Sequence, residues 1–223
     1  VKGDYKQVDP NNDVNMAQST NDSYPTAIRL GLLLGHDRLL QSLEPLIGAF
    51  SAKAKEFDHI LKMGRPQLQD AVPMTLGQEF QAFATTLEED LCRLRTLVPE
   101  LLCEINLGGT AIGTGINADP SYQHLAVDRL AAISGHGVKP AADLIEATSD
   151  MGDFVLFSGM LKRTAVKLSK ICNDLRLLSS GPRTGINEIN LPARQPGRSI
   201  MSGKVNPVIP EAVNQVAFEI IGN

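Results

Sequence analysis

The sequence of 223 residues contains few aromatic side chains, which make up 4% of it, and no tryptophan. A surface that stacks bases needs aromatic rings, so a base-stacking nucleic-acid site is disfavoured. Basic residues are also in deficit, with 21 Lys and Arg against 25 Asp and Glu and a net charge of −4. An acidic chain has no overall field that attracts nucleic acid or an anionic membrane. We therefore expect neither partner, and any anionic ligand must be held by a local cluster of donors.

Cysteine is scarce, and long apolar runs are missing. Cys92, Cys103 and Cys172 form no CxxC pair. This pattern favours reduced, packed thiols in a cytoplasmic protein over a redox or metal site. No apolar run reaches the ~18 residues of a membrane span, and the first residues are too charged for a signal peptide. The four histidines form no metal-type pair, so no metal site is predicted.

The residues that are abundant, Leu and Ala, recur at helical spacing in three long segments, 25–62, 76–106 and 143–179. Pro45 and Pro99 lie inside the first two, and each predicts a kink or a break. Shorter helices are expected at 124–134 and 207–221, and alternating strand patterns are almost absent. The fold class is therefore all-α, an elongated bundle of long helices. A second apolar set on the third segment favours a symmetric homo-oligomer with merged bundles.

A polar cluster at residues 18–26 precedes the first long helix. Asp22 or Ser23 can cap this helix, with Pro25 in its first turn. Alternatively, the side chains of residues 19–21 lie beside helix N–H groups and offer hydroxyl and amide donors to a carboxylate.

Two glycine-containing segments follow. Gly113, Gly115 and Ala118 match the GxGxxA form of a dinucleotide fingerprint. The preceding segment is helical and no βαβ unit is present, so we interpret residues 108–118 as a turn between helices. Residues 197–207 suit a mobile loop, in which Lys204 and Asn206 supply a cation and an amide just before a helix.

Read together, six segments resemble the aspartase/fumarase superfamily: STND at 19–22, GRPQLQDAVPMTLGQEF at 64–80, GGTAIGTGIN at 108–117, DLIEATSD at 143–150, KLSKICNDLRLLSSGPRTGINEINLP at 167–192 and SIMSGKVNPVIPE at 199–211. The resemblance covers essentially the whole chain. Within the superfamily, LQDAVPMTLGQEF, EATSD and NDLRLLSSGPR with NEINLP are more similar to the aspartate ammonia-lyases than to the class II fumarases.

This resemblance implies a reversible anti-elimination of ammonia from L-aspartate, which gives fumarate without an organic cofactor. A base removes a Cβ proton, and fixed donors stabilise the aci-carboxylate that forms. Family members assemble each site from three subunits of a homotetramer. The catalytic centre is matched by Arg198, Ser199 and Lys204, and the substrate-binding positions by Ser19, Thr20, Asn21, Pro66, Gln67, Lys204 and Asn206.

The sequence departs from the family pattern at three of its positions. Arg198 occupies the general-base position, which is serine in the family, and a guanidinium cannot accept the Cβ proton. Ser202 replaces a loop proline, and Pro66 replaces a substrate-binding threonine. Gln67, where fumarases carry histidine, is compatible with an aspartase-type site. Loss of a positioned base costs about 10²- to 10⁴-fold in rate, so we expect little catalysis from the chain as written.

Two further expectations concern the extent and the class of the protein. The family's N-terminal segment has no counterpart before Val1 and its C-terminal domain has none after Asn223, so residues 1–223 are expected to form the central helical domain of such a lyase. The alternatives to an aspartate ammonia-lyase are a class II fumarase-type hydratase and an inactive homologue or oligomerisation domain.

Overall fold

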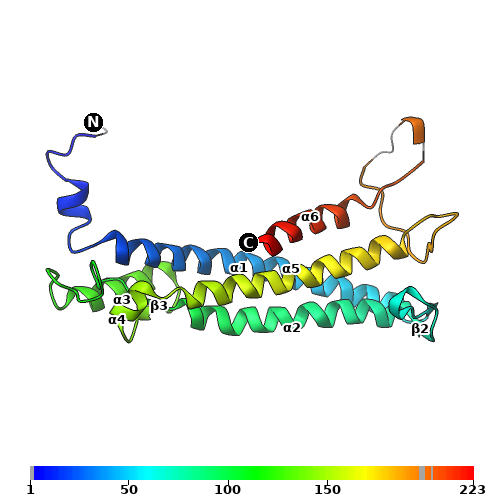
Figure 1. The fold of residues 1–223 in the computed structure, drawn as a ribbon, viewed down its shortest axis with the longest axis horizontal. Coiled ribbons are helices and arrows are strands. Elements are labelled where there is room, and N and C mark those ends of the chain that lie inside the picture. Colours follow the sequence, from blue (N-terminus) through cyan, green and yellow to red (C-terminus); the bar gives the residue numbers. More distant parts are fainter. Residues whose placement is uncertain (1–2, 196–198, 202) are drawn as a thin grey trace. The chain divides into compact units, whose positions relative to one another are not determined.

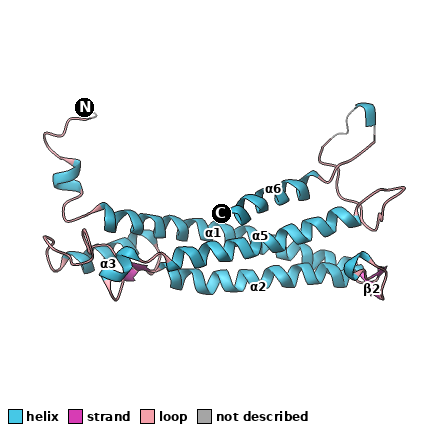
Figure 2. Ribbon diagram, viewed as in Figure 1, coloured by secondary structure: helices cyan, strands magenta, loops and turns pink. Residues whose placement is uncertain are grey.

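The computed structural model describes residues 3–195, 199–201 and 203–223. Helices account for most of it, which confirms the all-α prediction (Figures 1 and 2). The chain divides into two compact units, each built from two separate stretches. Unit 1 comprises Val1–Gln41 and Arg93–Phe157, and unit 2 comprises Ser42–Cys92 and Ser158–Asn223.

The principal helices are α1 (Thr20–Glu56), α2 (Leu76–Leu102), α3 (Tyr122–Ser134), α4 (Leu144–Ser149), α5 (Gly152–Leu178) and α6 (Val208–Gly222). Three short helices are η1 (Pro10–Val14), η2 (Pro66–Leu68) and η3 (Ser199–Met201). Four short strands form two pairs: β1 (Leu61–Met63) antiparallel to β2 (Pro73–Thr75), and β3 (Glu104–Ile105) parallel to β4 (Lys139–Pro140).

The core of unit 1 is aliphatic and surrounds one buried arginine. Its buried side chains include Leu33, Leu94, Val98, Leu102, Ile105 and Val127. The Arg29 guanidinium donates to the Leu101 carbonyl at 2.8 Å and to Asp153 at 2.9 Å, and it lies over the Phe154 ring. These contacts satisfy a charge that would be costly to bury alone.

The core of unit 2 contains a cluster of four phenylalanines. Phe50, Phe57, Phe80 and Phe83 form tilted and edge-on ring pairs. Thr75 starts α2 with a capping box, in which its Oγ1 accepts from the Gln78 N–H at 3.1 Å and its own N–H donates to Gln78 Oε1 at 3.0 Å.

The first predicted helix is longer than expected at its start and is unbroken. It begins at Thr20 rather than at Pro25, and it continues through Pro45. Pro45 deprives the Gln41 carbonyl of its usual donor, but both residues are exposed, so water can satisfy that carbonyl. The break predicted at Pro45 is therefore wrong.

The third predicted helix is two helices, because the chain is extended at Asp150, between α4 and α5. The Asp150 carboxylate accepts from the Gly152 N–H at 3.0 Å, so it satisfies one of the free donors at the start of α5. Met151, which the periodic pattern placed on a buried seam, is 56% exposed. The second helix ends at Leu102 rather than at Asn106 and passes through Pro99.

Candidate functional site

In unit 1 the polar cluster at 18–26 and the glycine-rich turn lie against each other, joined by one buried carboxylate. Asp22 is fully buried. Its Oδ1 accepts from the Ser19 N–H at 2.9 Å, and its Oδ2 accepts from the N–H groups of Gly108 and Thr110 at 3.1 and 3.0 Å. Ser19 Oγ in turn accepts from the Asn21 N–H at 3.1 Å. Ser19 is therefore the cap of α1, and Asp22 reaches back to it as in a capping box.

Pro25 also affects the hydrogen bonding of this cluster. A proline has no N–H for the carbonyl four residues earlier, which here belongs to Asn21. The buried Asn106 side chain supplies the missing donor, since its Nδ2 lies 2.9 Å from that carbonyl. The Asn21 side chain donates to the Ala111 carbonyl at 2.8 Å. The start of α1 and the turn are thus tied by hydrogen bonds in both directions.

The glycines of the turn serve close packing. Gly113 has φ +94°, and a Cβ there would lie 2.4 Å from the Leu144 carbonyl oxygen and 2.5 Å from Ile145 Cα. Gly113 is thus needed for the turn to meet α4. This supports interpreting residues 108–118 as a structural turn rather than a dinucleotide loop.

Three predicted substrate-binding residues lie at the edge of this cluster, at the positive end of α1. Thr20 and Asn21 are exposed and Ser19 is half-buried. The exposed Thr20 hydroxyl can donate to a carboxylate there without a charged side chain. The next three N–H groups of the helix already donate to Ser19.

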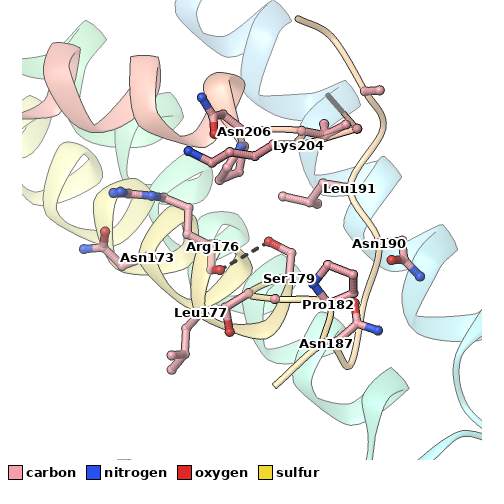
Figure 3. A pocket seen from close by; sticks show the side chains of 16 residues that line it. Asn173, Arg176, Leu177, Ser179, Pro182, Asn187, Asn190, Leu191, Lys204 and Asn206 are labelled. Carbon is pink, nitrogen blue, oxygen red and sulfur yellow. Dashed lines mark hydrogen bonds between the residues drawn. The ribbon is translucent and has the colours of Figure 1, made fainter. Parts of the chain in front are cut away.

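In unit 2, a pocket of about 640 Å³ lies between the end of α5 and the chain leading into α6 (Figure 3). Lys204 and Asn206 line one wall, and Arg176 and Asn173 approach from α5. None of the described residues that line the pocket is Asp or Glu. The pocket therefore has two cations and several amides, the donor set that an anion requires.

Asn214 fixes α6 beside this pocket. It is 3% exposed, and its carboxamide lies 2.8 Å from Asn173 Oδ1 and 3.2 Å from Arg176 Nη1. Arg176 and Asn173 were not predicted from the sequence as binding residues. Their only signal was the NDLR segment, which carried the resemblance but no stated role.

Pro66 and Gln67 lie in η2, at the tip of the β1–β2 hairpin in unit 2. Gln67 and Leu68 have φ of 53° and 62°, a left-handed conformation that side chains with a Cβ rarely adopt. Next to them, Arg65 forms a short hydrogen bond to Glu188 and lies 3.1 Å from Asp70. The Glu188 hydrogen bond, more than the other partners, raises the pKa of Arg65.

A buried lysine joins this ion-pair group. Lys62, whose side chain is 6% exposed, lies 2.6 Å from Glu79 and 3.1 Å from Glu188. Glu188 therefore faces the cations of both Lys62 and Arg65.

The predicted site residues fall into three groups. Ser19, Thr20 and Asn21 belong to unit 1, and Pro66, Gln67, Lys204 and Asn206 to unit 2. Within unit 2, Lys204 and Asn206 share the pocket, whereas Pro66 and Gln67 share the hairpin tip. Arg198 and Ser202 lie outside the described residues, and Ser199 is the first residue of η3.

The described parts of the chain contain no group of three or more His, Cys, Asp or Glu arranged to hold a metal ion. No helix in those parts combines the length and the hydropathy needed to cross a membrane.

Comparison with known proteins gives matches along the whole chain. It is 84% identical over 222 residues to an aspartate ammonia-lyase of Pseudomonas canavaninivorans and 58% identical over 222 residues to that of Escherichia coli K12. These matches cover 100% of the chain but 47% and 46% of the two relatives, so the chain spans about half the length of the curated relatives that it matches.

Solved structures also match nearly the whole chain. A fumarate lyase:delta crystallin from Brucella melitensis, bound to cobalt, superposes with a TM-score of 0.95 at 61% identity, over 99% of this chain and 48% of that one. A class II fumarase from Schistosoma mansoni superposes with a TM-score of 0.91 at 35% identity, over 97% and 48%. The family model described as Lyase matches residues 1–222, and with these relatives it shows that the chain belongs to that family, within the aspartase/fumarase superfamily.

Proposed function

We propose that the protein carrying this chain is an aspartate ammonia-lyase, which converts L-aspartate reversibly to fumarate and ammonia. The observation that carries this proposal is the 84% identity, along 100% of the chain, to a protein of that name. The anion-binding character of the unit 2 pocket supports it, because both aspartate and fumarate carry two carboxylates.

The proposed division of roles follows from the chemistry of each group. Lys204 and Asn206 hold one carboxylate, where a cation and an amide stabilise the negative charge that builds up as the Cβ proton leaves. Ser19, Thr20 and Asn21 bind the substrate with neutral donors at the start of α1. These groups lie on two units, so neither unit alone contains the proposed set.

Departures from the family pattern at the hairpin tip and at the base position lead us to expect weak catalysis. Gln67 offers an amide to the substrate, but Pro66 brings no hydroxyl and no N–H. At the base position, Arg198 stays protonated, so Ser199 or another group must take the proton if turnover occurs.

A class II fumarase-type hydratase is the second candidate, and the superposition on the Schistosoma mansoni class II fumarase favours it. An assay of fumarate absorbance near 240 nm with L-aspartate and with L-malate separates the two. We expect slow fumarate formation from L-aspartate and none from L-malate. Faster formation from L-malate would replace the lyase by the hydratase.

A third candidate is a catalytically inactive homologue or oligomerisation domain, motivated by Arg198 and Pro66. It is favoured if the protein binds fumarate but releases none from either substrate. Turnover at the rate of an intact family member would exclude it.

We also infer a homotetramer in the cytoplasm, with residues 1–223 as the central helical domain. In unit 2, Ile209 and Val216 lie two turns apart on one face of α6 and are 58% and 60% exposed, which suits a face covered by another subunit. Light scattering that shows a stable monomer would contradict the oligomer.

A further inference from the structure

We propose that Glu188 is a positioning residue that fixes the hairpin tip bearing Pro66 and Gln67 to the wall of the unit 2 pocket. This inference rests on the proposed function, because Pro66 and Gln67 are substrate-binding positions only if the protein is such a lyase. Glu188 itself does not line the pocket.

Glu188 lies on a segment that is hydrogen-bonded to the end of α5. Its N–H donates to the Leu178 carbonyl at 2.8 Å, and the N–H of Asn187 donates to the Ser180 carbonyl at 3.0 Å. Asn187 lines the pocket (Figure 3). The backbone at Glu188 is therefore continuous with the pocket wall and anchored where α5 ends.

The side chain of Glu188 binds two cations on the first arm of the hairpin. Its Oε1 bonds to Arg65, which directly precedes η2, and its Oε2 faces Lys62 Nζ, in β1, at 3.1 Å. Oε2 is buried without hydrogen-bond geometry to any described partner, so its charge is compensated by the cation alone. The Glu188 and Lys62 side chains are 16% and 6% exposed, which limits screening by water.

The backbone of the hairpin tip is in a conformation that its surroundings must impose. Gln67 and Leu68 are both left-handed without being glycine, a state that persists only where the surrounding structure imposes it. Within the tip, the Leu68 N–H donates to the Arg65 carbonyl at 3.1 Å and the Gln69 N–H to the Pro66 carbonyl at 3.1 Å. Arg65 thus belongs to the turn itself, and its guanidinium is the attachment point for Glu188.

The neighbouring Asp70 provides a contrast. It pairs with the same arginine at 3.1 Å, but its side chain is 71% exposed and lies in the same loop. An exposed ion pair of this kind contributes little. Asp70 therefore ties the loop to itself, whereas Glu188 ties it to the pocket wall.

The experiment compares Glu188→Gln with the matched control Asp70→Asn in the protein that carries this chain. Glutamine keeps the shape of Glu188 and removes its charge. Amide hydrogen exchange at Leu68 and Gln69 reports the tip, and titration with L-aspartate reports binding. We expect Glu188→Gln to speed exchange and to weaken L-aspartate binding, each by about tenfold. Asp70→Asn should change both by less than about twofold.

Each outcome of the experiment tests one part of the proposal. Unchanged exchange in Glu188→Gln overturns the positioning role whatever the protein binds. Faster exchange with unchanged L-aspartate affinity overturns its relevance to the site. Equal effects from Asp70→Asn would also overturn it, because the loss would then be one of any charge near Arg65. If the unaltered protein binds no L-aspartate, the proposed function fails, while the exchange result still decides whether Glu188 holds the tip.

Discussion

The polar cluster of unit 1 and the pocket of unit 2 are built in opposite ways. In unit 1, Asp22 and Asn106 are buried and their side chains are bonded to backbone groups. In unit 2, Lys204 and Arg176 line an open pocket, and Lys204 forms no ion pair with any described residue. The unit 1 donors that the structure engages hold the fold, whereas Lys204 in unit 2 stays available to a ligand.

This contrast separates stability from binding. A buried carboxylate that satisfies three N–H groups is costly to alter, because each donor then loses its partner in a place without water. An exposed lysine beside a pocket can change with little effect on folding. Variants in the two regions should therefore give effects of different kinds.

The largest effect is expected at Gly113. Gly113→Ala should lower the free energy of unfolding by about 4 kcal/mol, because the added Cβ meets the backbone of α4 and φ is +94°. Gly115→Ala is the matched control, with φ +66° but only the Gly108 carbonyl oxygen near, at 3.4 Å, and should cost about 1 kcal/mol. Denaturant unfolding measures both. Equal losses would mean that the turn does not pack on α4 as described.

Asp22→Asn should cost about 2–3 kcal/mol, since the amide nitrogen would face an N–H donor in a buried place. Asp143→Asn is its control: Asp143 is an exposed cap of α4, and asparagine caps helices equally well. The control should change stability by less than about 0.5 kcal/mol. Similar losses from the two variants would remove the distinction between a buried connection and an ordinary cap.

In unit 2, Lys204→Met should weaken fumarate binding by about tenfold, the cost of losing one charged hydrogen bond, and leave unfolding unchanged. Lys139→Met, in unit 1, removes an exposed lysine that pairs with Glu104 at 3.0 Å and should affect neither quantity. Calorimetric titration with fumarate measures the affinity. An unchanged affinity would show that the pocket is not the anion site.

The smallest effect concerns pH. His36 in unit 1 is 3% exposed, and neither ring nitrogen has a described hydrogen-bond partner. Burial lowers its pKa, against an opposing effect of the Asp37 carboxylate and with a smaller lowering from His136. Its folded pKa thus lies below its unfolded value of about 6.5, so the unfolded state binds the proton first and stability falls as pH drops through that region.

Unfolding measured between about pH 7.5 and 5.5 should therefore show less of this loss in His36→Gln than in the unaltered protein. The exposed His59→Gln should leave the pH dependence as it was. If His36→Gln keeps the full pH dependence, another group causes it.

The helices could be predicted because their signal is local. Periodic Leu and Ala gave α2 and α3 nearly in full, and Thr75 marked where α2 begins. The helix start predicted at Pro25 and the break predicted at Pro45 were wrong, because whether a proline ends a helix depends on what satisfies the carbonyl four residues earlier. Asn106, far along the chain, does so for Asn21. At Asp150 the prediction of one continuous helix was wrong for the opposite reason. The apolar spacing continues there, although Asp150 caps a new helix.

The candidate site was predictable only where side-chain chemistry and loop composition coincide. Lys204 and Asn206 combine a cation and an amide before a helix, and the structure places both at the pocket. Arg176 and Glu188 were missed, because their roles come from neighbours that sequence spacing does not reveal. For Glu188, these are Arg65 and Lys62, more than a hundred positions away.

The most direct test of the proposed lyase activity is the rate of fumarate formation from L-aspartate, followed near 240 nm, before and after Arg198→Ser with Pro66→Thr. We expect a slow reaction in the unaltered protein and a rise of about 10²-fold or more when a base and a hydroxyl are restored. Turnover of the unaltered protein at the rate of an intact family member, or no rise in the double variant, would contradict it.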